Sequence, residues 1–233
     1  MKNTVKNIGV LFFFMGLFAS FTTQAQSSCS SDYYPLDKGT VYELTHYDKK
    51  GKVDWITKNE VTATTSSTAT VHTVQTSSDG EEKINASYTV KCEANGIAMD
   101  LNQIISEQIA ANMTNPDIKM EMSGTDVIVP NDLKVGQTLP DSELNLDIIA
   151  PSTTINCHVE TSERKVIGEE SVTTPAGTFD CVVMTQKTDI KMLVSKHTNS
   201  KIWLSKGVGV VKQETYNKKG KLQGRDVLTS FKK

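Results

Sequence analysis

The sequence predicts a mainly β, antiparallel protein that carries one amphipathic helix. Two observations support this fold class. Apolar and polar residues alternate in several segments, and turn-forming stretches rich in Gly, Asp and Ser separate those segments. One segment departs from the alternation and shows helical spacing instead.

The alternation is clearest in residues 83–92, which read KINASYTVKC. One face of this segment carries Ile84, Ala86, Tyr88, Val90 and Cys92. A period of two sustained over such a length is typical of a strand with one buried and one exposed face. The segments 68–76, 154–160 and 179–194 have the same character. Most of the chain is therefore expected to form antiparallel strands.

Two nearly identical hexapeptides, YDKKGK at Tyr47–Lys52 and YNKKGK at Tyr216–Lys221, lie far apart in the chain. In each, the Asp or Asn side chain can bond to the backbone that follows it, and the glycine can take a positive φ. We interpret both hexapeptides as hairpin tips with exposed lysines. A binding motif for an anionic surface is the alternative interpretation.

A helix is predicted over residues 100–114, with Asp100 as its N-cap and Pro116 just beyond its end. Its apolar positions at helical spacing are Leu101, Ile104, Ile105, Ile109 and Met113. The simpler interpretation is a helix that covers the open side of the sheet, and the alternative is a lid over an apolar pocket. For that pocket, the expected ligand-lining residues are Ile104, Ile105, Ile109, Met113, Tyr88 and Val90.

The N-terminal residues predict export. Lys2 and Lys6 precede the apolar run 8–21, and small residues follow it, as in a secretory signal peptide. We expect cleavage after Ala25, which leaves residues 26–233 as a single β domain in the periplasm. The apolar run is too short for a transmembrane span. The alternative is a lipoprotein signal, in which Cys29 is acylated and anchors the protein to a membrane.

The charge of the chain excludes one class of partner. The formal net charge is −2, and the expected signal peptide removes two lysines and no acidic residue. A mildly acidic chain with scattered lysines lacks the basic footprint of a nucleic-acid-binding protein. We therefore expect no nucleic-acid partner.

Four cysteines, Cys29, Cys92, Cys157 and Cys181, remain after the expected cleavage. In an oxidising compartment an even number suggests two disulfides, and buried free thiols are the alternative. The favoured pairing is Cys157–Cys181, since both residues lie on well-patterned strands close in sequence. This pairing leaves Cys29 to bond with Cys92, which would fix the mature N-terminus to a strand.

No catalytic or metal-binding motif is recognisable in the sequence. The histidines, at positions 46, 72, 158 and 197, occur singly, so a metal ion would need ligands from separate elements. Cys157 and His158 are neighbours on an expected strand and point to opposite faces, so they cannot form a bonded nucleophile–base pair. We expect no enzymatic activity, no cofactor and no metal.

Five segments together resemble a known family. They read HYDKKGK, YTVKCEANGIAMDL, VPNDLKVGQTLPD, EESVTTPAGTFDC and SKIWLSKGVGVVKQETYNKKGKL. In this order they are similar to the TapB-like exported proteins of Bacteroides-type Gram-negative bacteria, a family without known activity. The resemblance covers nearly all of the mature chain and implies a strongly curved antiparallel sheet or half-open β-barrel, similar to lipoprotein carriers. A β-sandwich of two sheets is the alternative, and no catalytic residue is implied.

Two functions fit these expectations. The first is a binding module that holds a lipid or another apolar small molecule between the curved sheet and the helix. The second is a structural or interaction protein of the cell envelope, with a filled core and a face for a protein partner. Trp55 and Trp203 are the candidate anchors of such a face.

Overall fold

The computed structural model describes residues 28–110 and 117–233. The expected signal peptide, residues 1–25, and the predicted end of the helix near residue 114 lie outside the described residues. The elements are β1 (Val41–Asp48), β2 (Val53–Thr64), β3 (Thr68–Ser77), β4 (Glu82–Glu93), β5 (Gly96–Met99), α1 (Leu101–Ala110), β6 (Lys119–Gly124), β7 (Val127–Pro130), β8 (Ser142–Ala150), β9 (Thr153–Thr174), β10 (Gly177–Lys191), β11 (Lys196–Ser205), β12 (Gly209–Asn217) and β13 (Leu222–Lys232).

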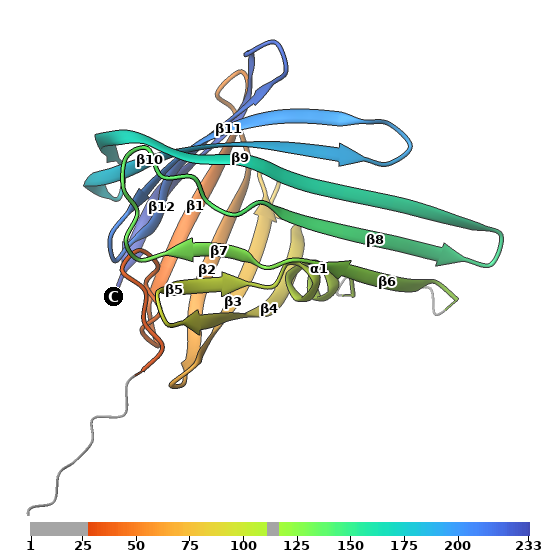
Figure 1. The fold of residues 1–233 in the computed structure, drawn as a ribbon, viewed down its shortest axis with the longest axis horizontal. Coiled ribbons are helices and arrows are strands. Elements are labelled where there is room, and N and C mark those ends of the chain that lie inside the picture. Colours follow the sequence, from red (N-terminus) through yellow and green to blue (C-terminus); the bar gives the residue numbers. More distant parts are fainter. Residues whose placement is uncertain (1–27, 111–116) are drawn as a thin grey trace, which may run out of the picture.

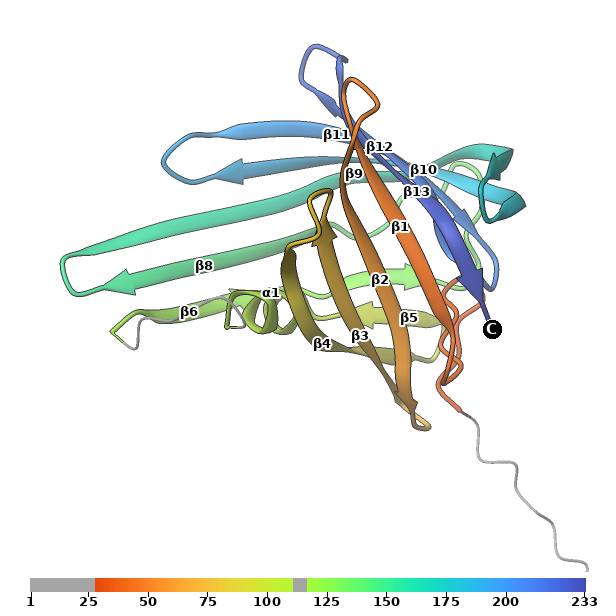
Figure 2. The ribbon, with the colours of Figure 1, turned by 180° about the vertical axis from the view of Figure 1, so that it is seen from behind.

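The strands of the described chain form one 13-stranded sheet in the order β6-β8-β9-β10-β11-β12-β13-β1-β2-β3-β4-β5-β7. Each neighbouring pair is antiparallel. The sheet curls until its two end strands approach, but β6 and β7 do not pair with each other (Figure 1 and Figure 2). The predicted curved, half-open antiparallel sheet with one helix is confirmed, and the alternative of two stacked sheets is wrong.

Alternating side chains explain why these segments form strands around a shared interior. In β3, Ala69, Val71 and Thr73 are buried and their neighbours are more exposed. On the concave face, Ala69 and Val71 pack into a core cluster with Val61 and Val166. Residues from the N-terminal segment, β5 and β7 complete the cluster at one end of the sheet. One end of the concave face is therefore filled by the chain itself.

A disulfide ties the N-terminal segment to the sheet. Cys29 bonds to Cys92 of β4, with their Cα atoms 5.4 Å apart. The backbone N–H of Cys29 also donates to the carbonyl of Thr65, in the turn between β2 and β3. Behind this attachment, Tyr33 and Leu36 enter the core. The described part of the chain thus begins at the end of the sheet formed by the β2–β3 turn.

The expected Cys157–Cys181 disulfide is wrong, because both residues are free thiols. In the β9–β10 hairpin, Cys181 lies opposite Glu170, whereas Lys191 lies opposite His158. The two cysteines are therefore near opposite ends of the hairpin, about 30 Å apart at strand spacing. A disulfide requires Cα atoms within about 7 Å.

Both repeated hexapeptides are hairpin tips, as predicted. Asp48 Oδ1 accepts the backbone N–H groups of Lys50 and Lys52 at 2.8 and 2.9 Å, and Gly51 has a φ of 84°. Asn217 plays the same part in the second tip, where its Oδ1 accepts the N–H groups of Lys219 and Lys221 at 2.9 and 3.1 Å. Gly220 there has a φ of 72°. The repetition in sequence therefore encodes one turn geometry used twice.

One predicted strand ends earlier than expected. The alternation suggested a strand over residues 179–194, but β10 ends at Lys191 and residues 192–195 form the turn to β11. Leu193 and Val194 are 85% and 81% exposed. The apolar run 192–194 fits a strand pattern in the sequence, but in the structure it lies in an exposed turn.

The gap between the two ends of the sheet is closed by a side chain and a loop. Arg164 of β9 is 2% exposed, and its guanidinium donates to the carbonyl of Ile128 in β7 at 3.1 Å and to that of Pro140 at 2.7 Å. The loop 131–141 adds backbone bonds to β9, including Gly136 N–H to Val166 O at 2.8 Å. We call this region, made of β7, loop 131–141 and Arg164, the seam.

Candidate functional site

A cavity of about 300 Å³ lies between the concave face of the sheet and the first half of α1. This volume is at the lower end of the range for pockets that bind small molecules. The walls come from β1, β2, β3, β4, β5, β12, the start of α1 and the N-terminal segment. The lining residues are Tyr34, Tyr42, Leu44, Thr57, Asn59, Thr73, Tyr88, Met99, Ile104, Gly209 and Val210. None of these side chains carries a formal charge at neutral pH.

Three tyrosines, Tyr34, Tyr42 and Tyr88, form part of the cavity wall. Burial raises the pKa of Tyr34 to about 12 and raises the pKa of Tyr88. Burial is also the main reason why the pKa of Tyr42 is well above its usual value, and the side-chain hydrogen bond between Tyr42 and Tyr88 adds to this rise. All three phenols are therefore neutral hydrogen-bonding groups at physiological pH. An uncharged ligand with one or two polar atoms matches such a wall.

The polar side of the cavity comes from β2 and β3. Thr73 Oγ1 donates to Asn59 Oδ1 at 2.5 Å, and both side chains are buried. Gln75 Nε2 donates to Thr57 Oγ1 at 3.3 Å, farther along the same pair of strands. These cross-strand pairs satisfy polar groups with each other, so that they cost little when an apolar ligand displaces water.

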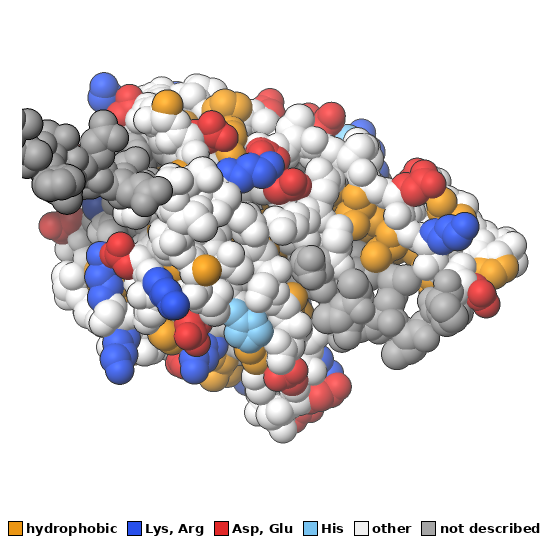
Figure 3. Space-filling model, turned by 90° about the horizontal axis from the view of Figure 1, so that it is seen from below, with side chains coloured by type: hydrophobic (Ala, Val, Ile, Leu, Met, Phe, Trp, Pro, Cys, Tyr) orange, Lys and Arg blue, Asp and Glu red, His pale blue; other side chains and the backbone are white. Residues whose placement is uncertain are grey.

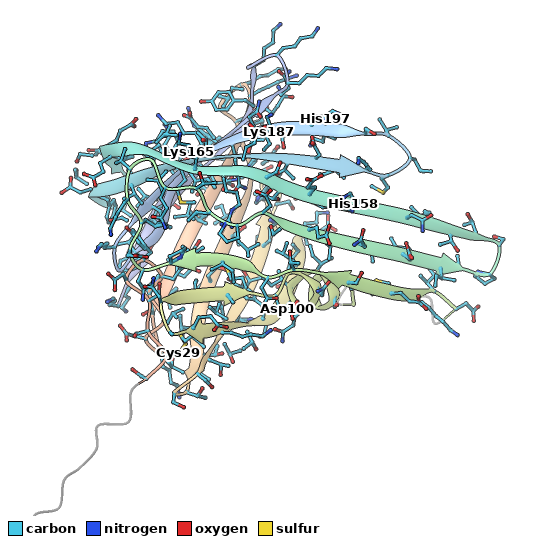
Figure 4. All side chains as sticks on the ribbon, in the orientation of Figure 1. Cys29, Asp100, His158, Lys165, Lys187 and His197 are labelled. Atoms are coloured by element: carbon cyan, nitrogen blue, oxygen red, sulfur yellow. A yellow bond between two sulfur atoms is a disulfide. The ribbon has the colours of Figure 1, made fainter. Side chains whose placement is uncertain are left out.

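The position of α1 is set by its first turn. Asp100 Oδ1 caps the helix by accepting the backbone N–H groups of Asn102 at 3.0 Å and Gln103 at 3.2 Å. Lys91 of β4 lies 3.6 Å from Asp100 and 3.3 Å from Asp126, which joins β6 to β7. Figure 4 shows Asp100 beside the helix, between β4 and β6. The predicted N-cap is confirmed, and it fixes the helix at the opening of the sheet.

A side chain of α1 also replaces a missing strand partner. β5 pairs with β4 only from Val90 onward, so the edge of β4 before that point needs another partner. Gln103 Oε1 accepts the N–H of Thr89 at 3.2 Å, and Gln103 Nε2 donates to Thr89 Oγ1 at 3.4 Å. The helix thus continues the cover that β5 provides, and it closes the cavity on that side.

The structure brings together some of the predicted ligand-lining residues. Tyr88 and Ile104 line the cavity. Val90 is 2% exposed and belongs to the adjacent core cluster, and Ile105 is half-buried without being part of the lining. The side chain of Ile109 and the whole of Met113 lie outside the described residues. Two of the four predicted residues whose side chains the structure describes thus lie on the cavity wall.

Sequence reasoning missed most of the strand residues of the cavity. Tyr42 and Leu44 alternate along β1, and this alternation could have placed both on one face. Tyr34 has no such signal, because it lies in an irregular segment before β1. Its position depends on Gly209, where Tyr34 and Pro35 pack against the backbone of β12.

Other depressions of the described surface differ in chemistry. One of about 420 Å³ lies beside Tyr33 and is lined by charged residues that include Glu169, Asp180 and Lys206. Hydrophobic side chains gather instead over the end of the molecule formed by β6 and β8, as Figure 3 shows from below. The cavity beside α1 differs from the charged depression in that none of its lining side chains carries a formal charge.

The described residues contain no group of three or more His, Cys, Asp or Glu side chains that could hold a metal ion. His46 pairs with Asp226, His197 with Asp189 and His158 with Asn145, each on a different part of the sheet. Burial raises the pKa of the Cys181 thiol to about 11, which makes this thiol a poor nucleophile.

The two tryptophans do not form an exposed anchor. Trp203 is 3% exposed, with Lys201 and Lys212 over its ring and its Nε1–H donated to Glu170 at 2.7 Å. Trp55 is half-buried and stacks on the ring of His46, with 3.7 Å between ring centroids. Both rings therefore pack against side chains of the sheet, and neither is free to contact a protein partner.

The fold and this site define a class of protein: a half-open antiparallel barrel with an uncharged internal cavity. The chain belongs to the DUF3108-like family, whose model matches residues 37–228. The family is one of unknown function. No curated protein matches the sequence. In the described part of the chain, no helix is both long and apolar enough to cross a membrane.

Two solved structures have a similar fold. One is a putative exported protein with a YmcC-like fold from Bacteroides fragilis, with 21% identity, a TM-score of 0.69 and coverage of 88% of this chain and 100% of that one. The other is a putative lipoprotein from Parabacteroides distasonis, with 20% identity, a TM-score of 0.68 and coverage of 87% and 100%. These likenesses support the fold, and they do not confirm the TapB-like name.

Proposed function

We propose that the chain is an exported, non-catalytic binding protein whose cavity holds an apolar small molecule or the acyl chain of a lipid. The observation that carries this proposal is the uncharged cavity between the concave face and α1. Its three neutral phenols orient a ligand by hydrogen bonds, and its aliphatic residues supply apolar contact. The absence of charge from the lining argues against acid–base or nucleophilic catalysis at this site.

The disulfide supports release into the periplasm over a membrane anchor. Acylation of a lipoprotein cysteine uses the same sulfur atom that Cys29 shares with Cys92. The two modifications exclude each other on one molecule. We therefore propose that the protein is cleaved after Ala25 and works in the periplasm without a lipid anchor at Cys29.

An envelope interaction protein is the second candidate function. Its support is the core cluster that fills one end of the concave face with residues such as Tyr33, Leu36 and Ile97. The burial of Trp203 removes the anchor expected for a protein partner. The binding proposal therefore takes precedence.

The test is to fill the cavity and measure binding of a neutral fluorescent apolar probe, N-phenyl-1-naphthylamine. In Ile104→Trp the indole occupies the cavity, so we expect the affinity of the probe to fall about tenfold or more. Ile56→Trp is the matched control, because Ile56 is 41% exposed and does not line the cavity. Equal binding by the wild type and both variants, with all three folded, contradicts the proposal.

A further inference from the structure

The sheet brings the two repeated hairpin tips side by side. β1 pairs with β13 so that Asp48 lies opposite Gly224. Since β1 runs into the first tip and β13 starts from the second, both tips project from the same end of the sheet (Figure 1). Cys29 lies at the other end, where its backbone bonds to the β2–β3 turn. The two similar hexapeptides are far apart in the sequence, but in the fold they are neighbours at one end of the sheet.

This surface presents lysines on a fixed backbone. The side chains of Asp48 and Asn217 are bound to backbone N–H groups within their own turns, so each tip has one defined shape. Within the described chain, none of the tip lysines forms an ion pair with a carboxylate. The exposed lysines of the two tips are Lys49, Lys50, Lys52, Lys218, Lys219 and Lys221.

An apolar tip lies next to the lysines. The turn between β10 and β11 exposes Met192, Leu193 and Val194 by 50%, 85% and 81%. These are three of the six large apolar residues exposed in the described chain, and they are consecutive. Lys191 and Lys196 flank them and are also exposed. Apolar side chains grouped in this way mark an interaction site more often than scattered ones do.

The base of the β10–β11 hairpin lies near the second basic tip, and from there the two hairpins diverge: the apolar turn projects to the side, whereas the basic tips project from the end of the sheet (Figure 1 and Figure 2). Thr198 of β11 lies opposite Asn217, the residue that opens the Asn217–Lys221 turn. The apolar turn begins only a few residues beyond Thr198, about 10 Å farther along the strand. His197 and Lys218 also line one shared depression. The basic tips and, to one side of them, the apolar turn therefore form the candidate docking region.

We propose that this end of the sheet docks on an anionic lipid membrane. Lysines at a membrane surface gain free energy from anionic headgroups, and apolar side chains beside them can enter the interface. The acidic groups at this end include Asp48 and Asp54 of the first hairpin, Glu214 and Asp226 near the second, Asp189 of β10, and the β3–β4 turn with Asp79 and its glutamates. The β3–β4 turn lies beyond β2, so it borders the basic surface on one side and limits its extent.

The docking surface does not depend on the proposed ligand of the cavity. It also requires no acyl chain at Cys29, which lies at the opposite end of the sheet. An apolar tip surrounded by lysines supplies two signals, and two signals together give firmer membrane binding than either alone. A ligand carrier docked in this way would meet the membrane with its tips, with Cys29 at the opposite end of the sheet.

The test is co-sedimentation of the mature chain with vesicles of phosphatidylcholine, with and without phosphatidylglycerol. We expect binding only when phosphatidylglycerol is present, and a decline of binding as salt screens the lysines. Lys218→Gln together with Lys219→Gln should weaken binding about twenty-fivefold, at about fivefold for each lysine. Leu193→Ser together with Val194→Ser should weaken binding at every salt concentration.

Matched controls carry the same changes at other surface positions. Lys38→Gln with Lys134→Gln removes the same charge, and Val135→Ser with Ile167→Ser removes exposed apolar residues outside the tips. Both controls should bind as the wild type does. The proposal is overturned if the wild type does not bind anionic vesicles or binds neutral vesicles equally well. It is also overturned if the tip variants bind as strongly as their controls. Far-ultraviolet circular dichroism shows that each variant is folded.

Discussion

From β8 through β5, neighbouring strands share backbone hydrogen bonds in an unbroken antiparallel series, whereas the end strands β6 and β7 each pair on one side only. At the seam, Arg164 and the loop 131–141 take the place of strand pairing. The body of the sheet therefore draws on many equivalent bonds, each worth a modest amount. The seam depends on a few residues, so a single substitution there should destabilise the seam and leave the body of the sheet intact.

The largest expected effect comes from the disulfide that ties the N-terminal segment to β4. Cys29→Ser with Cys92→Ser releases a constraint across 63 residues, for which chain entropy predicts a loss of about 4 kcal/mol in unfolding free energy. Urea denaturation measures this loss. Cys157→Ser is the control, because Cys157 is a free thiol, and it should leave the stability nearly unchanged. A double variant as stable as this control would show that the attachment does not hold the segment.

Arg164 tests the seam itself. Arg164→Ala leaves the carbonyls of Ile128 and Pro140 without their donors, and hydrogen bonds from a charged donor contribute about 1.5–3 kcal/mol each. The buried guanidinium also costs free energy to desolvate, so we expect a net loss of about 3 kcal/mol.

Hydrogen exchange should locate the damage of Arg164→Ala. Amides of β7 and of loop 131–141 should exchange faster, while amides of β1, β2 and β13 keep their protection until global unfolding. Arg164→Lys keeps the charge but not the forked geometry, and it should give an intermediate result. Uniformly faster exchange across the sheet would mean that the seam is not a separate region.

Alkaline pH tests the cavity that lies between the two regions. Burial raises the pKa of Tyr34 to about 12, so above pH 10 the unfolded chain loses this proton while the folded chain keeps it. Stability should therefore be fully present below about pH 10 and fall as the pH rises toward 12, by about 2 kcal/mol for this residue.

Tyr34→Phe should reduce the loss of unfolding free energy between pH 10 and pH 12 by the contribution of this residue. Urea denaturation at several pH values measures the reduction. Phenolate absorbance gives a second readout, since the buried phenols should titrate only when the protein unfolds. A folded protein in which Tyr34, Tyr42 and Tyr88 all ionise near pH 10 would contradict the enclosed cavity.

The smallest effects should come from the two hairpin tips, which belong to the body of the sheet. Gly51 and Gly220 have φ values of 84° and 72°, and a methyl group added at either position would meet no other atom within 4 Å. Replacement by Ala should cost about 1 kcal/mol at each site, from backbone strain alone. Thermal denaturation should find two similar shifts. Markedly unequal shifts would show that the repeated turns are not equivalent.

Local patterns predicted the body of the sheet well and the seam poorly. The alternation in residues 83–92 became β4, and both hexapeptides became turns, because strands and tight turns are encoded by neighbouring residues. No local sequence pattern identifies Arg164, since its hydrogen-bond partners in β7 and loop 131–141 lie more than twenty residues away in the sequence. The Cys157–Cys181 pairing failed for the same reason, because strand register, and not closeness in sequence, decides which sulfur atoms meet. The other predicted pair, Cys29 with Cys92, is present.

The candidate site shows the same division. Tyr88 and Ile104 could be predicted from a strand pattern and a helix pattern. Tyr34 and Tyr42 reach the cavity because the sheet curves and the N-terminal segment folds back over it. Curvature results from the summed twist of many strands, and no short segment reveals it.

Native mass spectrometry of the protein, isolated gently from the periplasm of its host, tests the binding proposal most directly. We predict the mass of residues 26–233 with one disulfide, plus an additional mass that leaves on denaturation and fragments as an apolar molecule. Replacement of Ile104 by Trp should abolish the additional mass, whereas replacement of Ile56 should preserve it. A wild-type protein that carries no additional mass, or one that the cavity variant retains in full, would contradict ligand binding in the cavity.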